Sequence, residues 1–339
     1  MSSFRNLIKN SEGNIYIIAE ACDNHMGSME MARALARAAK DAGADAVKFQ
    51  HHIAEEEMLR SAEMSDNFDQ HLFDFLEENA LSLSQHQDLK RFCDQINITY
   101  LCTPFSYKAA TQIAELVPFF KIGSGEFQDH WYVDKLKGLE KPVIFSTGMC
   151  EEEELYENIN FIEKTGLDFA LLNCVSEYPP KLEDMNLGFI RTLVDRYPSI
   201  VIGHSDHMPS TQSSVIAASF GAKIIEKHLT LSHFIAGPDK DVSMDPIQFS
   251  KLCSELRSVN IMCTDVKELH DSEKQIRNWA YRSVVASRDI YNGEILDESC
   301  IKTKRPGTGI ASKDYRKVLG KKLKFDVKCN TPIQWSDIR

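Results

Sequence analysis

The chain lacks the features that define several protein classes. Its 339 residues contain no run of about 18 apolar residues, so no membrane-spanning helix is expected. The first residues hold scattered charges and no apolar stretch, which argues against a secretory signal peptide. The nine cysteines are odd in number and form no C-x-x-C pair. They favour reduced thiols in a cytoplasmic protein over a disulfide framework or a zinc motif.

Positive charge and nucleotide-binding motifs are also scarce. Lys and Arg number 39 against 50 Asp and Glu, a formal net charge of −11, so nucleic acid is not expected as a ligand. The motif G-x-G-x-x-G is absent, which disfavours a dinucleotide site. With 43% apolar and 26% charged residues, the composition is that of a globular protein long enough for one large domain, alone or with a small one.

Short apolar segments alternate with helical patterns along most of the chain. The segments are Ile15–Ala19, Ala46–Phe49, Thr99–Leu101, Phe119–Ile122, Val143–Phe145, Phe169–Leu172, Ile200–Ile202 and Lys223–Ile225. They are continuously apolar, which indicates parallel strands buried on both faces. The segments 29–41 and 208–220 between them have the spacing of amphipathic helices. Eight such units predict a (β/α)8 TIM barrel, and an open Rossmann-type sheet is the alternative.

One connection departs from this regular pattern. Residues 51–97 are too many for a single helix, and residues 55–78 carry nine acidic side chains and one Arg. We expect an insertion that packs over the mouth or an outer face of the barrel. A solvated acidic loop is an equally supported alternative.

The pattern changes again near residue 264. We predict a catalytic barrel over 1–264, a charged and mostly helical linker over 265–282, and a small β-rich domain over 283–339 with short strands broken by Gly and Pro. Residues 302–328 hold ten Lys or Arg and two Asp. This basic segment is expected to dock on the acidic barrel of its own or a partner subunit, and a merely basic surface is the alternative.

Polar residues follow the apolar segments at the end where a TIM barrel has its active site. They are Glu20, Lys48, Gln50, Thr103, Lys121, Ser124, Ser146, Thr147, Ser176, Tyr178, Ser205, Asp206, His207, Glu226, Lys227 and His228. Because the carboxyl ends of parallel strands meet at one face, we expect all of these side chains to converge there.

Two lysines and four hydroxyls of this set indicate a phosphate ligand. They are Lys48, Thr103, Lys121, Ser124, Ser146 and Ser205. Charge-assisted donors of this kind bind phosphate, and Gly123 and Gly125 allow backbone N–H groups to approach it. For each lysine taken singly, a structural ion pair is the alternative.

Two histidines end neighbouring predicted strands. His207 and His228 are 21 residues apart, and two neutral imidazoles at one point suit a divalent metal with open positions. Glu20 could add a carboxylate ligand or act as a base that positions water. Structural buried histidines are the alternative. No histidine is placed to activate a cysteine, so Cys102, Cys150 and Cys174 are assigned to packing.

Several motifs in chain order resemble one family. They are Ile18–Ala21, Asn24-His25, Gly43–Gln50, Cys102–Phe105, Lys121–Glu126, Ser146–Met149, Ser205–His207, Ile225–His228 and Gly237–Asp239. This set is similar to the sialic acid synthases, which condense phosphoenolpyruvate with an N-acylated hexosamine. The segments Arg282–Ala286 and Lys304–Gly307 resemble the SAF (antifreeze-like) domain of that family.

The resemblance implies a barrel, a short linker and an SAF domain that caps the partner's active site in a domain-swapped homodimer. It implies His207 and His228 as ligands of Mn²⁺ or Mg²⁺, with Glu20 beside the reacting carbons. The residues implied for phosphoenolpyruvate are Lys48, Thr103, Lys121, Ser124, Ser146, Ser176 and Ser205. Those implied for the sugar are Gln50, Tyr178, Asp239 and Arg305.

The sequence therefore predicts a cytoplasmic enzyme that forms a nonulosonic acid and releases phosphate by C–O cleavage. N-acetylmannosamine is the default acceptor, and the diacetamido trideoxyhexoses that give legionaminate or pseudaminate are alternatives. A metal-dependent sugar-phosphate isomerase or epimerase would need the histidine pair but not the separate Lys/Ser cluster. A non-catalytic sugar-binding or antifreeze-like protein is disfavoured by the basic C-terminal segment.

Overall fold

The computed structural model describes residues 3–62 and 70–339, and the chain divides into two compact units. The first is Met1–Thr264 and the second is Asp265–Arg339. None of the described helices combines the length and the apolar character needed to cross a membrane.

Eight parallel strands form the centre of the first unit. They are β1 (Tyr16–Glu20), β2 (Ala46–His51), β3 (Thr99–Pro104), β4 (Phe120–Ile122), β5 (Val143–Ser146), β6 (Phe169–Cys174), β7 (Val201–Asp206) and β8 (Ile224–His228). Hydrogen bonding follows the order β3-β2-β1-β8-β7-β6-β5-β4, and the two outermost strands, β3 and β4, also lie in contact. The first unit is therefore a TIM barrel, which confirms the predicted fold class.

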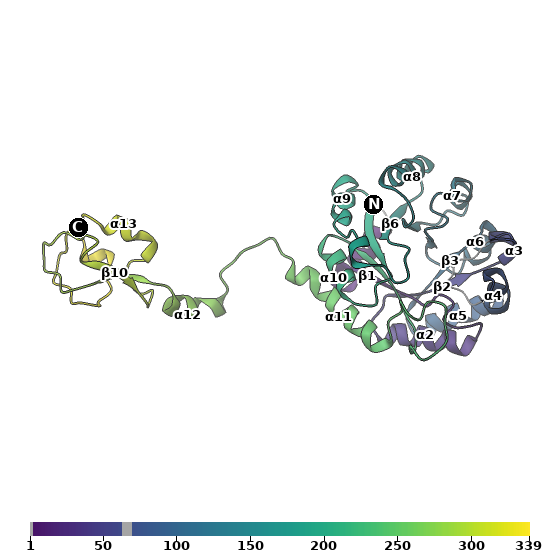
Figure 1. Cartoon of the computed structure of the whole chain (residues 1–339), viewed down its shortest axis with the longest axis horizontal. Helices are drawn as coiled ribbons and strands as arrows, with labels where there is room; N and C mark the ends of the chain where they lie inside the picture. Colours follow the sequence, from purple (N-terminus) through teal and green to yellow (C-terminus); the bar gives the residue numbers. More distant parts are fainter. Residues whose placement is uncertain (1–2, 63–69) are drawn as a thin grey trace. The chain divides into compact units, whose positions relative to one another are not determined.

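Helices surround the strands (Figure 1). They are α2 (Met29–Asp41), α5 (Leu83–Gln95), α6 (Tyr107–Ile113), α7 (His130–Lys137), α8 (Glu152–Thr165), α9 (Phe189–Arg196), α10 (Gln212–Ser219) and α11 (Pro246–Met262). Two short 3-10 turns, η1 (Glu12–Asn14) and η2 (Leu182–Asp184), lie in the connections.

Helix α2 shows why the sequence pattern forms these elements. The Ser28 side chain accepts a hydrogen bond from the Met31 N–H and caps the first turn. Ala32, Leu35 and Ala39 lie on the buried face at helical spacing. Helix α10 differs from the prediction, because it begins at Gln212 and not near residue 208. The carbonyl groups of residues 208 and 210 instead accept hydrogen bonds from the Lys227 ammonium group.

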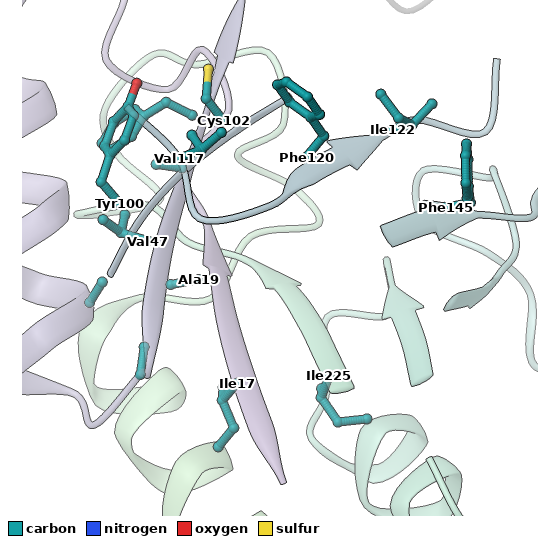
Figure 2. Close-up of a cluster of buried hydrophobic side chains, with 14 of the residues drawn as sticks. Ile17, Ala19, Val47, Tyr100, Cys102, Val117, Phe120, Ile122, Phe145 and Ile225 are labelled. Carbon is teal, nitrogen blue, oxygen red and sulfur yellow. The ribbon is translucent and has the colours of Figure 1, made fainter. Parts of the chain in front are cut away.

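The barrel strands are buried on both faces, and successive residues point alternately inward and outward. The outward side chains Ile17, Ala19, Val47 and Ile225 belong to the large core between strands and helices (Figure 2). The inward side chains are apolar only at the amino ends of the strands. There Tyr16, Ile18, Ala46, Leu101, Ile144, Ala170, Leu172, Val201 and Ile224 form a second cluster with Phe4 and Ile8 of α1 (Ser3–Asn10).

The insertion between β2 and β3 contains two helices before α5. They are α3 (Ala54–Glu57) and α4 (Leu72–Asn79). Ala54, Phe73, Phe75 and Leu76 form a small apolar cluster of their own, which supports these helices as a packed extension of the barrel. Residues 63–69 of the predicted acidic stretch lie outside the described residues.

The second unit contains α12 (Asp271–Ala280) and two antiparallel strands, β9 (Ser283–Ala286) and β10 (Ile301–Lys304). Its remaining elements are η3 (Ser312–Asp314), α13 (Tyr315–Val318) and η4 (Trp335–Asp337). The other two predicted strands are wrong in detail: residues 293–296 and 323–327 form only isolated bridges. An apolar core that includes Val284, Leu296 and Ile333 holds this unit together.

Candidate active site

A cavity of about 680 Å³ lies at the carboxyl ends of the barrel strands. Its lining contains every predicted site residue except Arg305. These residues are Glu20, Lys48, Gln50, Thr103, Lys121, Ser124, Ser146, Ser176, Tyr178, Ser205, His207, His228 and Asp239. Arg305 belongs to the second unit, where its guanidinium carbon lies 5.3 Å from the centre of the Trp279 ring.

The direction of each strand residue decides which of them reach the cavity. Glu20, Lys48 and Glu226 continue the inward-facing series that is apolar lower in the barrel. Pairing of the strands sets Glu20 level with Lys48 on one side and with His228 on the other.

The expectation that all strand-end polar residues converge is therefore wrong for Thr147, Asp206 and Lys227, which do not line the cavity. Asp206 and Lys227 are instead a fully buried ion pair of 2.9 Å. Lys227 lowers the pKa of Asp206 to about 2 despite its burial. The Asp206 carboxylate also accepts hydrogen bonds from Ser213 and Ser214 at the start of α10, so it anchors the chain next to His207.

Two lysines and two glutamates form a buried charge cluster at the base of the cavity. Lys48 forms an ion pair with Glu20 and donates a hydrogen bond to Thr103 Oγ1 at 2.9 Å. Glu226 Oε1 lies 3.5 Å from Lys48 Nζ and 3.6 Å from Lys121 Nζ. The sequence placed Glu226 at a strand end but assigned it no role, although its inward direction follows from the period of two along β8.

The two glutamates have different electrostatic surroundings. Burial raises the pKa of Glu20, and the neighbouring Glu226 adds to this effect. Burial also acts on Glu226, but Lys121 and Lys48 hold its pKa below the ordinary value. Glu226 is therefore the permanent counter-charge of the lysines, while Glu20 is the carboxylate that more readily accepts a proton.

The hydroxyl groups of the cavity differ in their hydrogen-bond partners. Ser205 Oγ donates to Glu226 Oε1 at 3.2 Å, and Ser124 Oγ accepts from the Gly148 N–H at 3.0 Å. Ser146 Oγ is buried and has no hydrogen-bond partner among the described residues. Because buried polar groups are normally paired, this hydroxyl is available to a ligand.

Ser124 and Ser176 approach the chain at Gly148. A Cβ atom at residue 148 would collide with Ser176 Oγ and lie 2.9 Å from Ser124 Oγ. Glycine at this position therefore allows two hydroxyls from different loops to meet at the wall of the cavity.

The imidazoles of His207 and His228 lie side by side, with ring centres 5.2 Å apart. His207 Nδ1 is 2.8 Å from the Val175 carbonyl oxygen. Since a carbonyl only accepts, Nδ1 carries the proton and Nε2 has a free lone pair. Tyr178 stacks on the His207 ring with a centre-to-centre distance of 4.1 Å.

Both imidazoles have the properties of metal ligands. Burial lowers the pKa of His207 to about 4 and that of His228 well below its ordinary value, so both rings are neutral near pH 7. His228 Nδ1 is buried without a hydrogen-bond partner among the described residues. Two neutral rings, one with an orphaned nitrogen, fit the predicted divalent metal.

Sequence reasoning gave no role to Cys22. Its Sγ, a nitrogen of His228 and an oxygen of Asp239 lie within 4.8 Å of one another. Asp239 Oδ2 is 3.8 Å from His228 Nδ1. No spacing rule connects residues so far apart in the chain, and only their closeness to the ends of β1 and β8 could have indicated this cluster.

Sequence reasoning also gave no role to His52, which contacts the cavity residue Gln50, or to Glu126, which lines the cavity. Gln50 Nε2 donates to Glu20 Oε1 at 3.4 Å, and the Gln50 Oε1 atom pairs with His52 Nε2 at 3.0 Å. Glu126 lines the cavity, and burial raises its pKa to about 7. Both His52 and Glu126 lie in loops beyond the strand ends, where strand periodicity gives no direction.

Comparison with known proteins identifies the family. Residues 35–268 match the NeuB family and residues 281–339 match the SAF domain. An uncharacterized protein of Methanocaldococcus jannaschii is 36% identical over 95% of this chain and 94% of its own length. The N,N'-diacetyllegionaminic acid synthase of Campylobacter jejuni is 35% identical over 90% of this chain and 94% of its own length.

A solved structure agrees with these matches. The N-acetylneuraminic acid (sialic acid) synthetase of Leptospira borgpetersenii is 30% identical with a TM-score of 0.70, covering 77% of this chain and 90% of its own. The chain described here is thus a member of the NeuB family of sialic, legionaminic and pseudaminic acid synthases, with an SAF domain at its C-terminal end.

Proposed function

We propose that the chain condenses phosphoenolpyruvate with an N-acyl hexosamine and water to form a nonulosonic acid and phosphate. The vinyl carbon of phosphoenolpyruvate bonds to the aldehyde carbon of the open-chain sugar. Water adds to C2 of the phosphoenolpyruvate unit, and the C2–O bond to phosphate then breaks.

The observation that carries the proposal is the joint presence of a cationic hydroxyl cluster and a neutral imidazole pair in one cavity. Lys48 and Lys121 are buried and would bind the phosphate and carboxylate oxygens together with Ser146, which lacks a partner among the described residues. A metal-dependent sugar-phosphate isomerase would use the imidazole pair but would not need the separate cluster of lysines and hydroxyls. Holding both substrates on one rigid strand-end rim supplies the positioning part of catalysis.

Glu20 is proposed to handle the proton of the attacking water. It is buried beside Lys48, and its raised pKa brings proton uptake and release closer to neutral pH. Gln50 holds one Glu20 oxygen by a hydrogen bond, and the Cys22 N–H donates to the same oxygen at 2.7 Å. These contacts orient the Glu20 carboxylate, which is proposed to exchange a proton with the attacking water. Lys121 and Lys48 would stabilise the departing phosphate.

Mn²⁺ or Mg²⁺ is the proposed cofactor, held by His207 and His228. When bound, the ion supplies Lewis-acid polarisation of the sugar aldehyde. The chain's own contribution is to present two neutral nitrogens, with the Val175 carbonyl fixing the tautomer of His207. Tyr178 stacks on the same ring and is proposed, with Gln50 and Asp239, to contact the sugar.

The second unit is proposed to complete the site in a homodimer. Arg305 would reach the sugar in the partner's barrel, and the net positive segment 302–328 would dock on an acidic surface. Such a swapped cap makes each active site depend on two chains. We place the reaction in the cytoplasm, where phosphoenolpyruvate is available.

N-acetylmannosamine is proposed as the acceptor, giving N-acetylneuraminate. The resemblance to a synthase of N,N'-diacetyllegionaminic acid at 35% identity supports a diacetamido trideoxyhexose as the second candidate. The two acceptors differ in the substituents that a pocket with Gln50, Tyr178 and Asp239 would have to contact.

The test is phosphate release from phosphoenolpyruvate with Mn²⁺ and a panel of N-acetylmannosamine, mannose and diacetamido trideoxyhexoses. We expect release with one N-acyl sugar and none with mannose. In water labelled with heavy oxygen, the label should enter the sugar product and not the phosphate, as C–O cleavage requires. His228→Ala should lose bound metal and turnover with its circular dichroism unchanged. No release with any sugar, from folded and metal-loaded protein, would refute the reaction.

A further inference from the structure

Cys22 has an unusual backbone conformation for its residue type. Its φ angle is +40°, in the left-handed region that favours glycine, and its side chain is fully buried. A non-glycine residue in this region carries conformational strain, and such residues are enriched at functional sites. Cys22 follows Glu20 at the end of β1, so this backbone turn directs its thiol toward the strand-end region.

The Cys22 thiol lies among groups that attract a cation. It is a free thiol within 4.8 Å of an Asp239 carboxylate oxygen. Asp239, Glu20 and Asp23 act on it as negative charges. His228 is 94% buried, and its Nδ1 atom has no hydrogen-bond partner in the described part of the chain. An unpaired nitrogen in this position is available as a ligand.

We propose that Cys22, His228 and Asp239 form a binding site for a thiophilic divalent cation such as Zn²⁺. The three ligand atoms lie within 4.8 Å of one another, and the nitrogen-to-oxygen distance is already 3.8 Å. A tetrahedral ion with bonds of about 2.0–2.3 Å holds its ligand atoms roughly 3.5 Å apart. Small side-chain rotations would therefore bring the three ligand atoms to the distances that such an ion requires. His228 and Asp239 also line the cavity.

The chemistry of the three atoms selects the ion. Sulfur, nitrogen and oxygen ligands in tetrahedral geometry suit Zn²⁺, whereas Mg²⁺ and Mn²⁺ prefer oxygen-rich octahedral sites. Binding replaces the proton of the Cys22 thiol, which leaves to solvent. The site does not depend on the proposed synthase reaction, because it requires only these three side chains.

The site competes with the pair of His207 and His228. A neutral imidazole has a single lone pair, so His228 can bind only one ion at a time. Zn²⁺ on Cys22 would therefore remove His228 from the His207 pair and would take Asp239 from the sugar. We expect Zn²⁺ to displace Mn²⁺ and not to add a second ion.

The test is Co²⁺ loading of the full-length protein, because a thiolate bound to Co²⁺ gives a charge-transfer absorption band in the near ultraviolet. We expect the band in the wild type and its loss in Cys22→Gly, whose backbone suits the left-handed conformation and should preserve folding. Cys174→Ser is the matched control, since Cys174 is a thiol that lines the cavity but is not part of the proposed ligand set. It should keep the band, as should His207→Ala.

Competitive dialysis with elemental analysis gives a second readout. Zn²⁺ should bind to the wild type with one ion per chain, and Cys22→Gly should weaken it by more than the roughly 10- to 100-fold typical of losing an outer-shell partner. Absence of the band in the wild type, or its persistence in Cys22→Gly, would overturn the site. Loss of the band in folded His207→Ala would also overturn the proposed site, because the cation would then depend on His207.

Discussion

Glu226 Oε1 lies 3.6 Å from Lys121 Nζ, and both side chains are buried at the base of the cavity. Across the described residues, Glu226 is the carboxylate in ion-pair contact with Lys121, and it also faces Lys48 at 3.5 Å. A phosphate-bearing substrate would approach these lysines in the presence of this internal anion. Glu226 therefore compensates part of the charge of the two lysines and would compete with the substrate for the same cations.

Glu226→Gln should make the barrel less stable and more responsive to phosphate. Removing one partner of a buried ion pair typically costs about 3–5 kcal/mol, because the remaining charge is left without compensation. Inorganic phosphate should then raise the thermal midpoint of the variant more than that of the wild type. Glu126→Gln is the control, since Glu126 lines the cavity but has no ion pair with either lysine among the described residues. Equal shifts in all three proteins would contradict the role of Glu226.

Lys121→Met should raise KM for phosphoenolpyruvate. A hydrogen bond to a charged group contributes about 1.5–3 kcal/mol, which corresponds to a roughly 10- to 150-fold weaker substrate interaction. The KM for the sugar should change little, because Lys121 is assigned to phosphoenolpyruvate alone. Lys90→Met is the matched control, since Lys90 pairs with Asp94 on the outer helix α5. A variant with an unchanged KM for phosphoenolpyruvate would remove Lys121 from the binding site.

Glu126 should make stability depend on pH. Burial raises its pKa in the folded chain to about 7 from an ordinary value of 4.5, so the folded state binds the extra proton between these pH values. The free energy of unfolding should therefore fall as pH rises from about 4.5 to 7, by about 3 kcal/mol for this shift.

Glu126→Gln should remove the contribution of Glu126 to this dependence, because the amide remains neutral. At pH 8 the variant should be more stable than the wild type by up to that amount, and near pH 4.5 the two should differ little. Urea unfolding followed by far-ultraviolet circular dichroism at several pH values measures the difference. The exposed Glu153→Gln is the control. A parallel pH profile for Glu126→Gln and the wild type would rule out Glu126 as the titrating group.

Arg305→Ala and His228→Ala should complement each other if Arg305 acts in the partner's barrel. Each variant alone should have low activity. After subunit exchange at equal amounts, half of the dimers are mixed and each mixed dimer has one complete site, so about one quarter of wild-type activity should return. Native mass spectrometry would verify that mixed dimers formed. Verified mixed dimers without recovered activity would place Arg305 in its own chain's site.

Local patterns were sufficient for the elements whose side chains pack regularly. The helix predicted over 29–41 is α2, and the predicted strands 283–286 and 301–304 are β9 and β10. The start of α10 was predicted too early in the chain. The backbone carbonyl groups of residues 208 and 210 accept hydrogen bonds from Lys227 of β8 and do not belong to the helix. A contact made by another strand cannot be seen in the local periodicity of the segment itself.

The sequence alone determined the barrel, the family resemblance and the polar residues at the strand ends. The barrel and the strand-end residues follow from short-range order, namely apolar segments of strand length and polar residues directly after them. The family resemblance follows from the set of motifs in chain order. Tertiary structure decided which of those residues share a cavity. Asp206 and Lys227 turn outward to pair with each other, while Ser205 and Glu226 turn inward and meet at 3.2 Å.

Only the closed barrel could bring Cys22 to His228 and Asp239. Strand β1 pairs with β8, so the first and last strands of the barrel become neighbours although most of the barrel sequence lies between them. Distance along the chain carries no information about such a contact. Pairing of the strands and the direction of each side chain set it.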